Sequence, residues 1–497
     1  MNALVIDLTH GGLIIAMELA KRDLYKNIWT WDIYNTSNKT QKDLLKKKGI
    51  KLVENSIEIL SNINDKNALK SLIKSHYPSF NEDDDLTVIF PIHCPLHIKP
   101  DFTHHQIIKI ILKDWNNPFC IEVTGVKGKT SAVGMLKEIL AFKNPLVLSS
   151  LGAEIKSSEK SKSSTILKKN ISITPASIIE TIKLAENYDY DSCIFETSLG
   201  ATGMADVGLL TNLVEDYPIA RGISKASEAK KQIFDSSMVC CEYETFYKHY
   251  SDLKNDLGNK VNTFSFNNYN KKIDIYGENK SNLYPLNINY GFKKSSIEIK
   301  AINLRTIKGN VINDRFTIET FAPSPYQIKN VLAVICCALT SDIEISQIQE
   351  GLGNFKGLEG RSSLKRIDNV NIIEEINPGI NVKAIENALN LAENLKKAFV
   401  ILGGEYGITC EEVNEKDVAD LLKKIFYSKN YDKNKSFNLN KSNLILTGDL
   451  GKVIKEKMDF IPLYASKPSQ GVEMAIERGA NNIILIYRSN YANLKKR

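Results

Sequence analysis

The sequence predicts an α/β protein built from about three domains. Its length of 497 residues is too great for a single hydrophobic core, because most domains contain about 50–200 residues. Short apolar runs with the composition of buried strands alternate with segments of helical spacing, which is typical of mostly parallel sheets covered by helices. We expect domains over residues 1–116, 117–322 and 323–497, with a proline-containing hinge at the start of the last.

The composition indicates a globular protein of modest positive charge. Hydrophobic residues make up 43% of the chain and charged residues 25%, and the formal net charge is +7. Lysine is used along the whole chain, and no basic stripe is interleaved with aromatic residues. A compositional bias of the source genome therefore explains the charge better than a nucleic-acid surface does. A mildly basic protein also suits a polyanionic substrate.

Cysteine usage and hydropathy favour a cytoplasmic location. The eight cysteines include no C-x-x-C pair, and most lie in apolar runs, which indicates reduced core residues rather than disulfides or a zinc site. No stretch reaches the roughly 18 apolar residues of a membrane span. Asp7 and Glu18 interrupt the region where a signal peptide would be apolar. We expect a cytoplasmic protein that binds neither membranes nor nucleic acids, and the sequence leaves the oligomeric state open.

A strand, a glycine loop and a helix follow one another at residues 119–140, in the order of a nucleotide-triphosphate site. Glycines let backbone N–H groups surround phosphate oxygens, Lys129 neutralises the outer phosphates, and the Thr130 hydroxyl can ligate Mg²⁺. A chance Gly-Lys-Thr at a helix start is the simpler alternative, which the flanking strand and helix disfavour. We expect ATP and Mg²⁺ as cofactors. The expected nucleotide-binding residues of the loop are Thr124, Gly125, Val126, Lys127, Gly128, Lys129, Thr130 and Ser131.

The loop is shorter than the usual P-loop, because Val123 stands where a glycine is required. Its form G-x-x-G-K-T, residues 125–130, resembles the ATP loop of the Mur ligase family, which contains cell-wall peptide ligases and folylpolyglutamate synthase. The resemblance covers residues 117–400 by motifs and the rest by architecture. It implies a Rossmann-like N-terminal domain, a central P-loop ATPase-type domain with a mostly parallel sheet, and a Rossmann-like C-terminal domain.

Two further segments of the central domain bear on metal binding. Glu196 ends a strand beside the loop, where a Mg²⁺ ligand is needed to bridge the phosphates, and it matches the magnesium-binding glutamate of the family. Residues 227–234 resemble the family segment whose first lysine is carbamylated, which points to Lys230 as a catalytic residue and metal ligand. An ordinary exposed helix lysine is an equally supported interpretation. Tyr217 stands where the family usually has a histidine, so a metal contact there is in doubt.

Three residues of the last predicted domain are assigned roles by the same resemblance. Asn330 is retained from a helical motif in which an asparagine contacts adenine. Arg361 matches the arginine of a G-x-x-G-R segment, which would reach the γ-phosphate on domain closure and stabilise the charge that develops on the transferred phosphoryl group. Glu375, which follows a strand, is the candidate for contact with the ribose.

The N-terminal region begins like a Rossmann fold but lacks the G-x-G-x-x-G fingerprint, so we do not expect a dinucleotide site. His10 follows the first strand, at the end where open sheets bind ligands, and His93 follows a later strand. Imidazole could bind carboxylates or ligate a metal, including one carried by the substrate. Scattered loop histidines are the more common explanation. We name His10 and His93 as candidate substrate residues.

Together these residues predict ATP-dependent activation of a carboxylate, with Lys129, Arg361 and Lys230 as the catalytic residues. The family resemblance implies an acyl phosphate that a nucleophile then attacks. Residues 4–12, 198–208 and 375–379, with the ATP loop at 123–130, further resemble a branch of the family that closes a ring on a nickel-containing tetrapyrrole. There the nucleophile is a carbon atom of the same molecule.

Two alternatives stay open at this stage. One is an amide-forming Mur or folylpolyglutamate-type ligase, which would need an amino acid as co-substrate. The other is a nucleotide-dependent binding protein that has lost the chemistry, which the tyrosine at position 217 supports.

Overall fold

The structure, a computed structural model, forms two compact units, each described here by itself. Unit 1 comprises Met1–Ile288, Ile297–Glu319 and Ile328–Asn354, and unit 2 comprises Asn289–Ser296, Thr320–Gln327 and Phe355–Arg497. For Arg361 and Ser362 only the backbone is described. The described residues are 1–54, 63–116, 118–158, 164–267, 281–358, 361–376, 380–393, 395–407, 413–427, 439 and 441–489.

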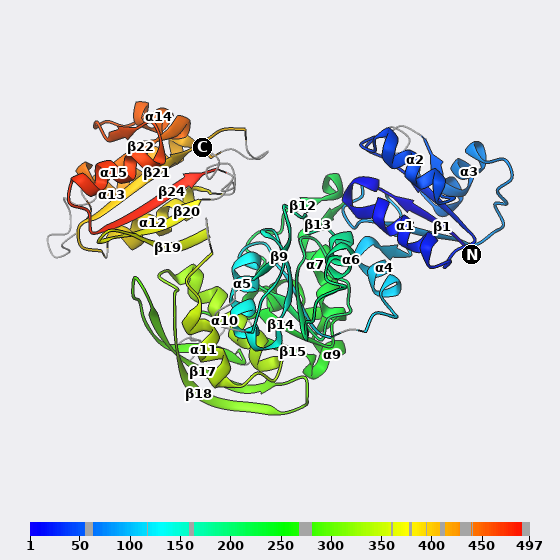
Figure 1. The fold of residues 1–497 in the computed structure, drawn as a ribbon, viewed down its shortest axis with the longest axis horizontal. Helices are drawn as coiled ribbons and strands as arrows, with labels where there is room; N and C mark the ends of the chain where they lie inside the picture. Colours follow the sequence, from blue (N-terminus) through cyan, green and yellow to red (C-terminus); the bar gives the residue numbers. More distant parts are fainter. Residues whose placement is uncertain are drawn as a thin grey trace. The chain divides into compact units, whose positions relative to one another are not determined.

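The N-terminal part of unit 1, drawn in blue in Figure 1, contains a parallel sheet. Its strand order is β3-β2-β1-β4-β5. Alternate residues of β1 enter two different cores, because successive side chains of a strand point to opposite faces: Leu4 and Ile6 pack with Trp29 and Trp31, and Ala3 packs with the helices of the other face. The strands are β1 (Asn2–Ile6), β2 (Asn27–Trp31), β3 (Lys51–Val53), β4 (Leu86–Phe90) and β5 (Phe102–Thr103), and the helices are η1 (Leu8–Gly12), α1 (Leu13–Lys21), α2 (Lys39–Lys47), α3 (Lys66–His76) and α4 (His104–Ile111).

The strand order reverses beside β1. The chain runs from β1 outward to β2 and β3, and then returns to place β4 on the other side of β1. In an open parallel sheet such a switch point leaves a crevice at the carboxyl ends of the two strands, and ligands bind there. The residues that follow β1 and β4 are therefore placed where a ligand is expected.

The second sheet of unit 1 has eleven strands, with β6 between β11 and β10. Both neighbours run parallel to β6, so the carboxyl ends of all three strands meet at one edge of the sheet. The strands are β6 (Phe119–Thr124), β7 (Leu146–Ser149), β8 (Gly152–Ile155), β9 (Thr165–Lys169), β10 (Ser192–Glu196), β11 (Val207–Leu210), β14 (Met238–Glu242), β15 (Val261–Phe264), β16 (Leu283–Asn289), β17 (Ser295–Arg305) and β18 (Val311–Thr320).

Helices and one short hairpin complete this part of the chain. Helix α11 packs closely on α5: a Cβ on Gly351 would lie 2.4 Å from Cα of Ile139. This contact helps to explain why Ile328–Asn354 groups with unit 1, while the boundary expected at residue 323 stays a prediction. The elements are α5 (Lys129–Ile139), η3 (Ala141–Lys143), α6 (Pro175–Leu184), the hairpin β12 (Pro218–Ile219) and β13 (Ser224–Lys225) with η4 (Ala220–Gly222) between its strands, α7 (Ala226–Lys230), η5 (Lys231–Asp235), α8 (Tyr243–His249), η6 (Ser251–Leu253), α9 (Lys254–Leu257), η7 (Gly258–Lys260), α10 (Pro325–Thr340) and α11 (Ile345–Asn354).

Unit 2 contains a six-stranded sheet of order β19-β20-β24-β21-β22-β23. Only the β19–β20 pair is antiparallel among the strand pairs described in this sheet, and apolar cores cover both faces. No helix in the described residues is both long and apolar enough to cross a membrane. The elements are β19 (Arg361–Ile367), β20 (Val370–Ile376), α12 (Val382–Glu393), β21 (Ala398–Gly404), α13 (Glu415–Tyr427), η10 (Lys441–Asn443), β22 (Leu444–Thr447), α14 (Gly448–Glu456), β23 (Leu463–Ala465), α15 (Pro468–Glu477) and β24 (Asn482–Arg488).

Candidate active site

The predicted ATP loop joins β6 to α5, as the sequence indicates, and two glycines give it its shape. Gly125 has φ +144° and Gly128 has φ +84°, conformations that residues with a Cβ rarely adopt. A Cβ on Gly125 would lie 2.0 Å from Oγ1 of Thr211, and one on Gly128 would lie 2.2 Å from Oδ1 of Asn330. Both glycines are therefore required by backbone conformation and by space.

The loop is held by the two residues that follow β11. The Val126 N–H donates to the Asn212 carbonyl at 3.0 Å, and the Lys127 N–H donates to Oδ1 of Asn212 at 3.1 Å. In return, Oγ1 of Thr211 and Nδ2 of Asn212 donate to the Lys127 carbonyl, at 2.7 and 3.0 Å. These bonds fix the loop before any phosphate arrives, so little reorganisation is needed on binding.

Lys129 begins α5, and its ammonium group lies over the loop. Nζ donates to the Gly125 carbonyl at 3.0 Å and reaches the Val126 carbonyl at 3.5 Å. The helix N-terminus adds its own partial positive charge at the same point. The loop therefore gathers positive charge and N–H donors in one place, as an anionic phosphate requires.

The predicted Mg²⁺ ligands lie next to each other. Thr130 donates from Oγ1 to Oε1 of Glu196 at 3.0 Å, and the Ser150 N–H donates to Oε2 of the same carboxylate at 3.0 Å. The Ser150 hydroxyl lies 3.0 Å from Oγ1 of Thr130. Carboxylate and hydroxyl oxygens are ligands that suit Mg²⁺, so the residues present fit this ion.

Lys230 is buried rather than exposed, so the interpretation as an ordinary surface lysine is wrong. Its side chain is 0% exposed, and Nζ donates to the Ser198 carbonyl at 2.7 Å and to Oγ1 of Thr124 at 3.4 Å. Burial, with a smaller contribution from the charge of Lys129, lowers the pKa of Lys230 to about 7. A large fraction of the amine is therefore neutral near pH 7, the form that reacts as a nucleophile.

The structure places one of the three residues predicted from the C-terminal motifs at the loop. Asn330, on α10, is 2% exposed, and its amide faces Gly128. Its Nδ2 is buried and has no hydrogen-bond partner among the described residues. Arg361 begins β19, with its side chain outside the described part, and pairs in register with Glu375 of β20. Both belong to unit 2, and their contacts with the nucleotide stay predictions.

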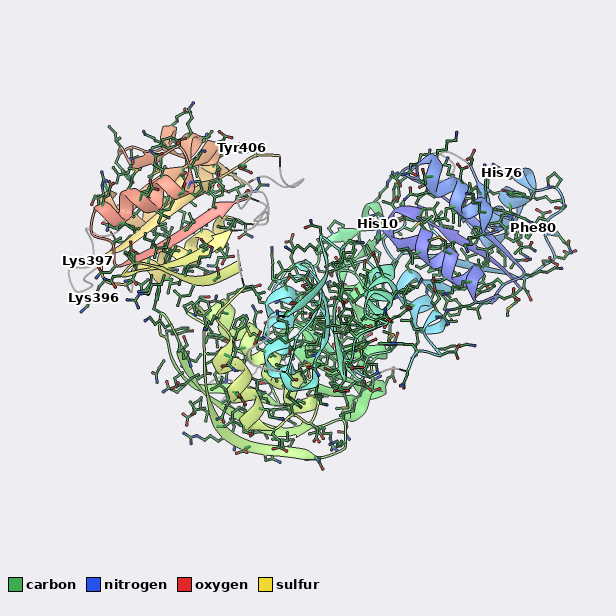
Figure 2. The ribbon with its side chains drawn as sticks, viewed as in Figure 1. His10, His76, Phe80, Lys396, Lys397 and Tyr406 are labelled. Carbon is green, nitrogen blue, oxygen red and sulfur yellow. The ribbon has the colours of Figure 1, made fainter. Side chains whose placement is uncertain are left out.

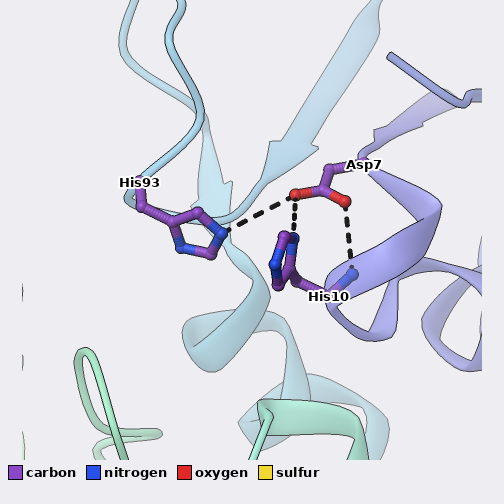
Figure 3. Close-up of side chains that lie close together, drawn as sticks. All are labelled: Asp7, His10 and His93. Carbon is purple, nitrogen blue, oxygen red and sulfur yellow. Dashed lines mark hydrogen bonds and ion pairs between the residues drawn. The ribbon is translucent and has the colours of Figure 1, made fainter. Parts of the chain in front are cut away.

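A second cluster of polar side chains occupies the switch point of the N-terminal sheet (Figure 3). Asp7 directly follows β1, and its Oδ2 lies 2.7 Å from Nδ1 of His10 and 3.7 Å from Nε2 of His93. The structure thus brings together the two histidines named from the sequence, with a buried carboxylate between them. In Figure 2, His10 and Phe80 are labelled at opposite ends of this N-terminal part.

The protonation of the histidines in this region differs with their surroundings. The hydrogen bond to Asp7 raises the pKa of His10 above its ordinary value, although burial opposes it. Burial lowers the pKa of His93, and it lowers the pKa of His104 to about 4 and that of His105 to about 3. At neutral pH we therefore expect His93, His104 and His105 to be neutral.

Helix α4 connects this cluster to the ATP-binding sheet. The His104 ring lies 3.3 Å from the His10 carbonyl through Nδ1. Thr103 precedes His104 in the chain, and its Oγ1 accepts a hydrogen bond of 2.9 Å from Nε2 of Gln232. Gln232 follows Lys230 by two residues. The cluster at the switch point and the buried lysine therefore lie on the two sides of one packed interface within unit 1.

The amino-acid sequence is similar to those of two coenzyme F(430) synthetases and to one family model. The chain is 27% identical over 433 residues to coenzyme F(430) synthetase of Methanocaldococcus jannaschii, covering 85% of this chain and 88% of that protein. It is also 27% identical to coenzyme F(430) synthetase of Methanosarcina acetivorans, with 97% of each chain covered. Residues 364–490 match the family model of the coenzyme F430 synthetase CfbE C-terminal domain.

Solved structures confirm the fold. MurC of Thermotoga maritima superposes with a TM-score of 0.51 at 15% identity and covers 100% of this chain and 97% of its own. The chain therefore has the fold of these Mur ligases. MurF of Thermotoga maritima, solved in complex with ADP, gives a TM-score of 0.52 at 12% identity and covers 99% of this chain and 92% of its own. The predicted α/β architecture with mostly parallel sheets and the resemblance to F430 synthetases are confirmed.

Sequence reasoning missed residues that lie far from any motif. Ser150 was not singled out, although it follows β7 at the sheet edge where β6 and β10 also end. Asp7 was assigned no role of its own, although it interrupts the apolar N-terminal stretch and lies within the segment 4–12 that carries part of the resemblance. Its place directly after the first strand, three residues before His10, was the signal that could have identified it.

Proposed function

We propose that this protein is an ATP-dependent ligase that activates a substrate carboxylate as an acyl phosphate. The similarity to coenzyme F430 synthetases over most of the chain supports a specific reaction, the cyclisation of 15,17(3)-seco-F430-17(3)-acid to coenzyme F430. The substrate would be a nickel-containing tetrapyrrole, and the enzyme would act in the cytoplasm. The observation that carries the proposal is the glycine loop together with the pair beside it, in which Oγ1 of Thr130 lies 3.0 Å from Oε1 of Glu196.

Phosphoryl transfer from ATP explains the arrangement at the loop. Lys129 and the loop N–H groups that do not donate to Asn212 would hold the phosphates, and Thr130 and Glu196 would hold Mg²⁺. When bound, Mg²⁺ neutralises charge on the β- and γ-phosphates. A carboxylate oxygen of the substrate attacks the γ-phosphorus, the bond to the bridging oxygen breaks, and ADP leaves. Arg361, when it reaches the phosphate, would stabilise the charge that develops in this step.

The second step forms the ring. A carbon atom of the same substrate molecule attacks the acyl carbonyl, the carbon–oxygen bond to phosphate breaks, and the proton of the attacking carbon passes to a base. The product is a cyclic ketone and the by-product is inorganic phosphate. Water must be kept from the acyl phosphate, which it would otherwise hydrolyse. The neutral amine of Lys230 could add to CO₂ and release a proton to solvent, and the resulting carbamate would supply a second anionic metal ligand.

The remaining assignments complete the proposal. The nucleotide would contact Thr124–Ser131 of the loop, with Asn330 beside Gly128 and Glu375 at the ribose. His10 and His93 would contact the substrate at the switch point of the N-terminal sheet. We also retain the division into domains at residues 1–116, 117–322 and 323–497.

The direct test is incubation of the purified protein with ATP, Mg²⁺ and the nickel seco-acid. We expect a change in the absorption of the tetrapyrrole, loss of one water from its mass, and one ADP for each ring closed. Each reaction should proceed without an amino acid. A requirement for an added amino acid would instead favour the amide-forming ligase, and ADP release independent of any carboxylate would exclude both.

A further inference from the structure

Asp7 has an unusual backbone conformation, and hydrogen bonds hold its side chain in place. Its φ is +71°, in the left-handed region that a residue with a Cβ seldom occupies, and its side chain is fully buried. Oδ1 accepts the N–H groups of Thr9 and His10, at 3.0 and 3.2 Å, and Oδ2 accepts the Nδ1 hydrogen of His10 at 2.7 Å. Such outliers persist where the surrounding structure fixes them, and they are concentrated at functional sites.

This arrangement fixes both the tautomer and the orientation of His10. Because Nδ1 donates to Asp7, the lone pair of the neutral ring lies on Nε2, at the side of the ring away from the carboxylate. The His93 ring packs edge-on against the His10 ring, with centroids 4.5 Å apart and planes at 87° (Figure 3). The His10 side chain is 41% exposed, so Nε2 can be reached from outside.

The cluster also has the ligand atoms of a metal site, which could be used in two ways. One atom from each of Asp7, His10 and His93 lies within 4.8 Å of the others, so a bare ion could be chelated among them. Ligands at about 2.0–2.1 Å around a tetrahedral ion lie roughly 3.3 Å apart. The 2.7 Å bond between Asp7 and His10 is shorter, and a chelated ion would have to replace it. Binding through Nε2 of His10 keeps that bond, as in carboxylate–histidine–metal triads.

The groups around His10 suit a flat, acidic ligand. The Tyr34 ring lies edge-on to His10, with centroids 5.9 Å apart. Burial and the charge of Asp7 raise the pKa of Tyr34 to about 12, and the charge of Arg221 opposes this rise. Arg221 is exposed and lies in η4 of the hairpin β12–β13, so this hairpin offers a cation to a substrate carboxylate.

We propose that Nε2 of His10 binds the metal centre of the tetrapyrrole substrate as an axial ligand, with Asp7 as the positioning residue that orients the ring and fixes its tautomer. The inference rests on the proposed function, since it requires a substrate that carries a metal. It places the macrocycle over the switch point of the N-terminal sheet. His93 supports the ring of His10 from its edge.

The test is a binding experiment with the nickel seco-acid in the absence of ATP. An added axial ligand changes the coordination of Ni²⁺, so the visible spectrum and the nickel X-ray absorption edge of the bound substrate report the bond directly. We expect a spectral change with the wild type, none with His10→Ala, and at least a tenfold weaker affinity in that variant. Added imidazole should restore the spectral change of the bound substrate in His10→Ala. Asp7→Asn should weaken this change, because the asparagine amide can donate a hydrogen bond to Nδ1 of His10 and so favour the tautomer that carries its proton on Nε2.

Two controls separate the possible outcomes. His97→Ala, an exposed histidine of the loop after β4, and Lys129→Ala should both keep the spectral change. Ring closure by the wild type, together with a His10→Ala variant that still gives the spectral change of the wild type on binding the seco-acid, would overturn this inference alone. Failure of the wild type to bind or convert the tetrapyrrole would overturn the proposed function and the inference with it. Stoichiometric binding of Ni²⁺ or Zn²⁺ alone, lost in His93→Ala, would overturn axial ligation in favour of a chelated ion.

Discussion

Replacing Gly128 by alanine tests the geometry of the ATP loop through two separable costs. The first is conformational: at φ +84° a Cβ approaches the following carbonyl oxygen, which costs about 1–2 kcal/mol. The second is steric, because the new Cβ would lie 2.2 Å from Oδ1 of Asn330, and forcing an extra carbon into a packed site costs about 1–3 kcal/mol. Together the variant should lose roughly 2–5 kcal/mol of stability.

Gly309 provides the matched control. It has φ +87°, nearly that of Gly128, but nothing lies within 4 Å of the place its Cβ would occupy. Gly309→Ala should therefore show the conformational cost alone, about 1–2 kcal/mol. In thermal denaturation, where about 1 kcal/mol corresponds to roughly 2–4 °C for a domain of about 150–250 residues, Gly128→Ala should lower the midpoint about twice as much as the control.

ATP binding and a double variant complete this test. We expect at least a tenfold rise in the Kd for ATP in Gly128→Ala and no change in Gly309→Ala, because only the first displaces the N–H groups of the loop. Adding Asn330→Ala to Gly128→Ala should recover the steric part of the lost stability. Equal melting midpoints in the two single variants, with equal ATP affinities, would refute the close approach of Asn330 to the loop.

Three further variants test the charges of the site. Lys129→Ala should lower substrate-dependent ADP release by about 100-fold or more, the loss typical for one group that stabilises transition-state charge, and an undiminished rate would contradict its role. Glu196→Gln keeps the shape of the side chain but loses the carboxylate, so turnover should require a higher Mg²⁺ concentration, measured by titrating the metal at fixed ATP. The pKa of Lys230 is about 7 in the folded protein, against 10.5 for the unperturbed group. Between these two pH values the unfolded chain binds more protons than the folded one, so the free energy of unfolding should rise with pH. Denaturant unfolding at pH 7 and pH 9 should show this rise in the wild type and a smaller rise in Lys230→Met.

The sequence was sufficient where the chemistry is local. The strand, the glycines at 125 and 128, Lys129 and Thr130 are consecutive or nearly so, and their spacing alone predicts a phosphate loop. Glu196 was also found, since it ends a strand of the same parallel sheet. Even there the sequence did not indicate that Thr211 and Asn212 hold the loop by hydrogen bonds, because the pairing of β11 with β6 is a property of the folded sheet.

Burial could not be read from the sequence in the same way. Lys230 stands in a short helix of a lysine-rich chain, where an exposed side chain is equally expected. The structure buries its amine against the Ser198 carbonyl, and this burial is what lowers its pKa. Desolvation depends on what packs around a group, and residues close in sequence do not determine that packing.

The sequence by itself determined the α/β class, the glycine loop between a strand and a helix, and the likeness to Mur ligases, because each depends on periodicity or on groups a few residues apart. Tertiary structure alone decided that His93 meets Asp7 and His10 across more than 80 residues of chain. It also decided that Asn330 reaches Gly128. The physical reason is that strand order and helix packing bring distant segments together, and a local pattern specifies the strand or helix but not its neighbour.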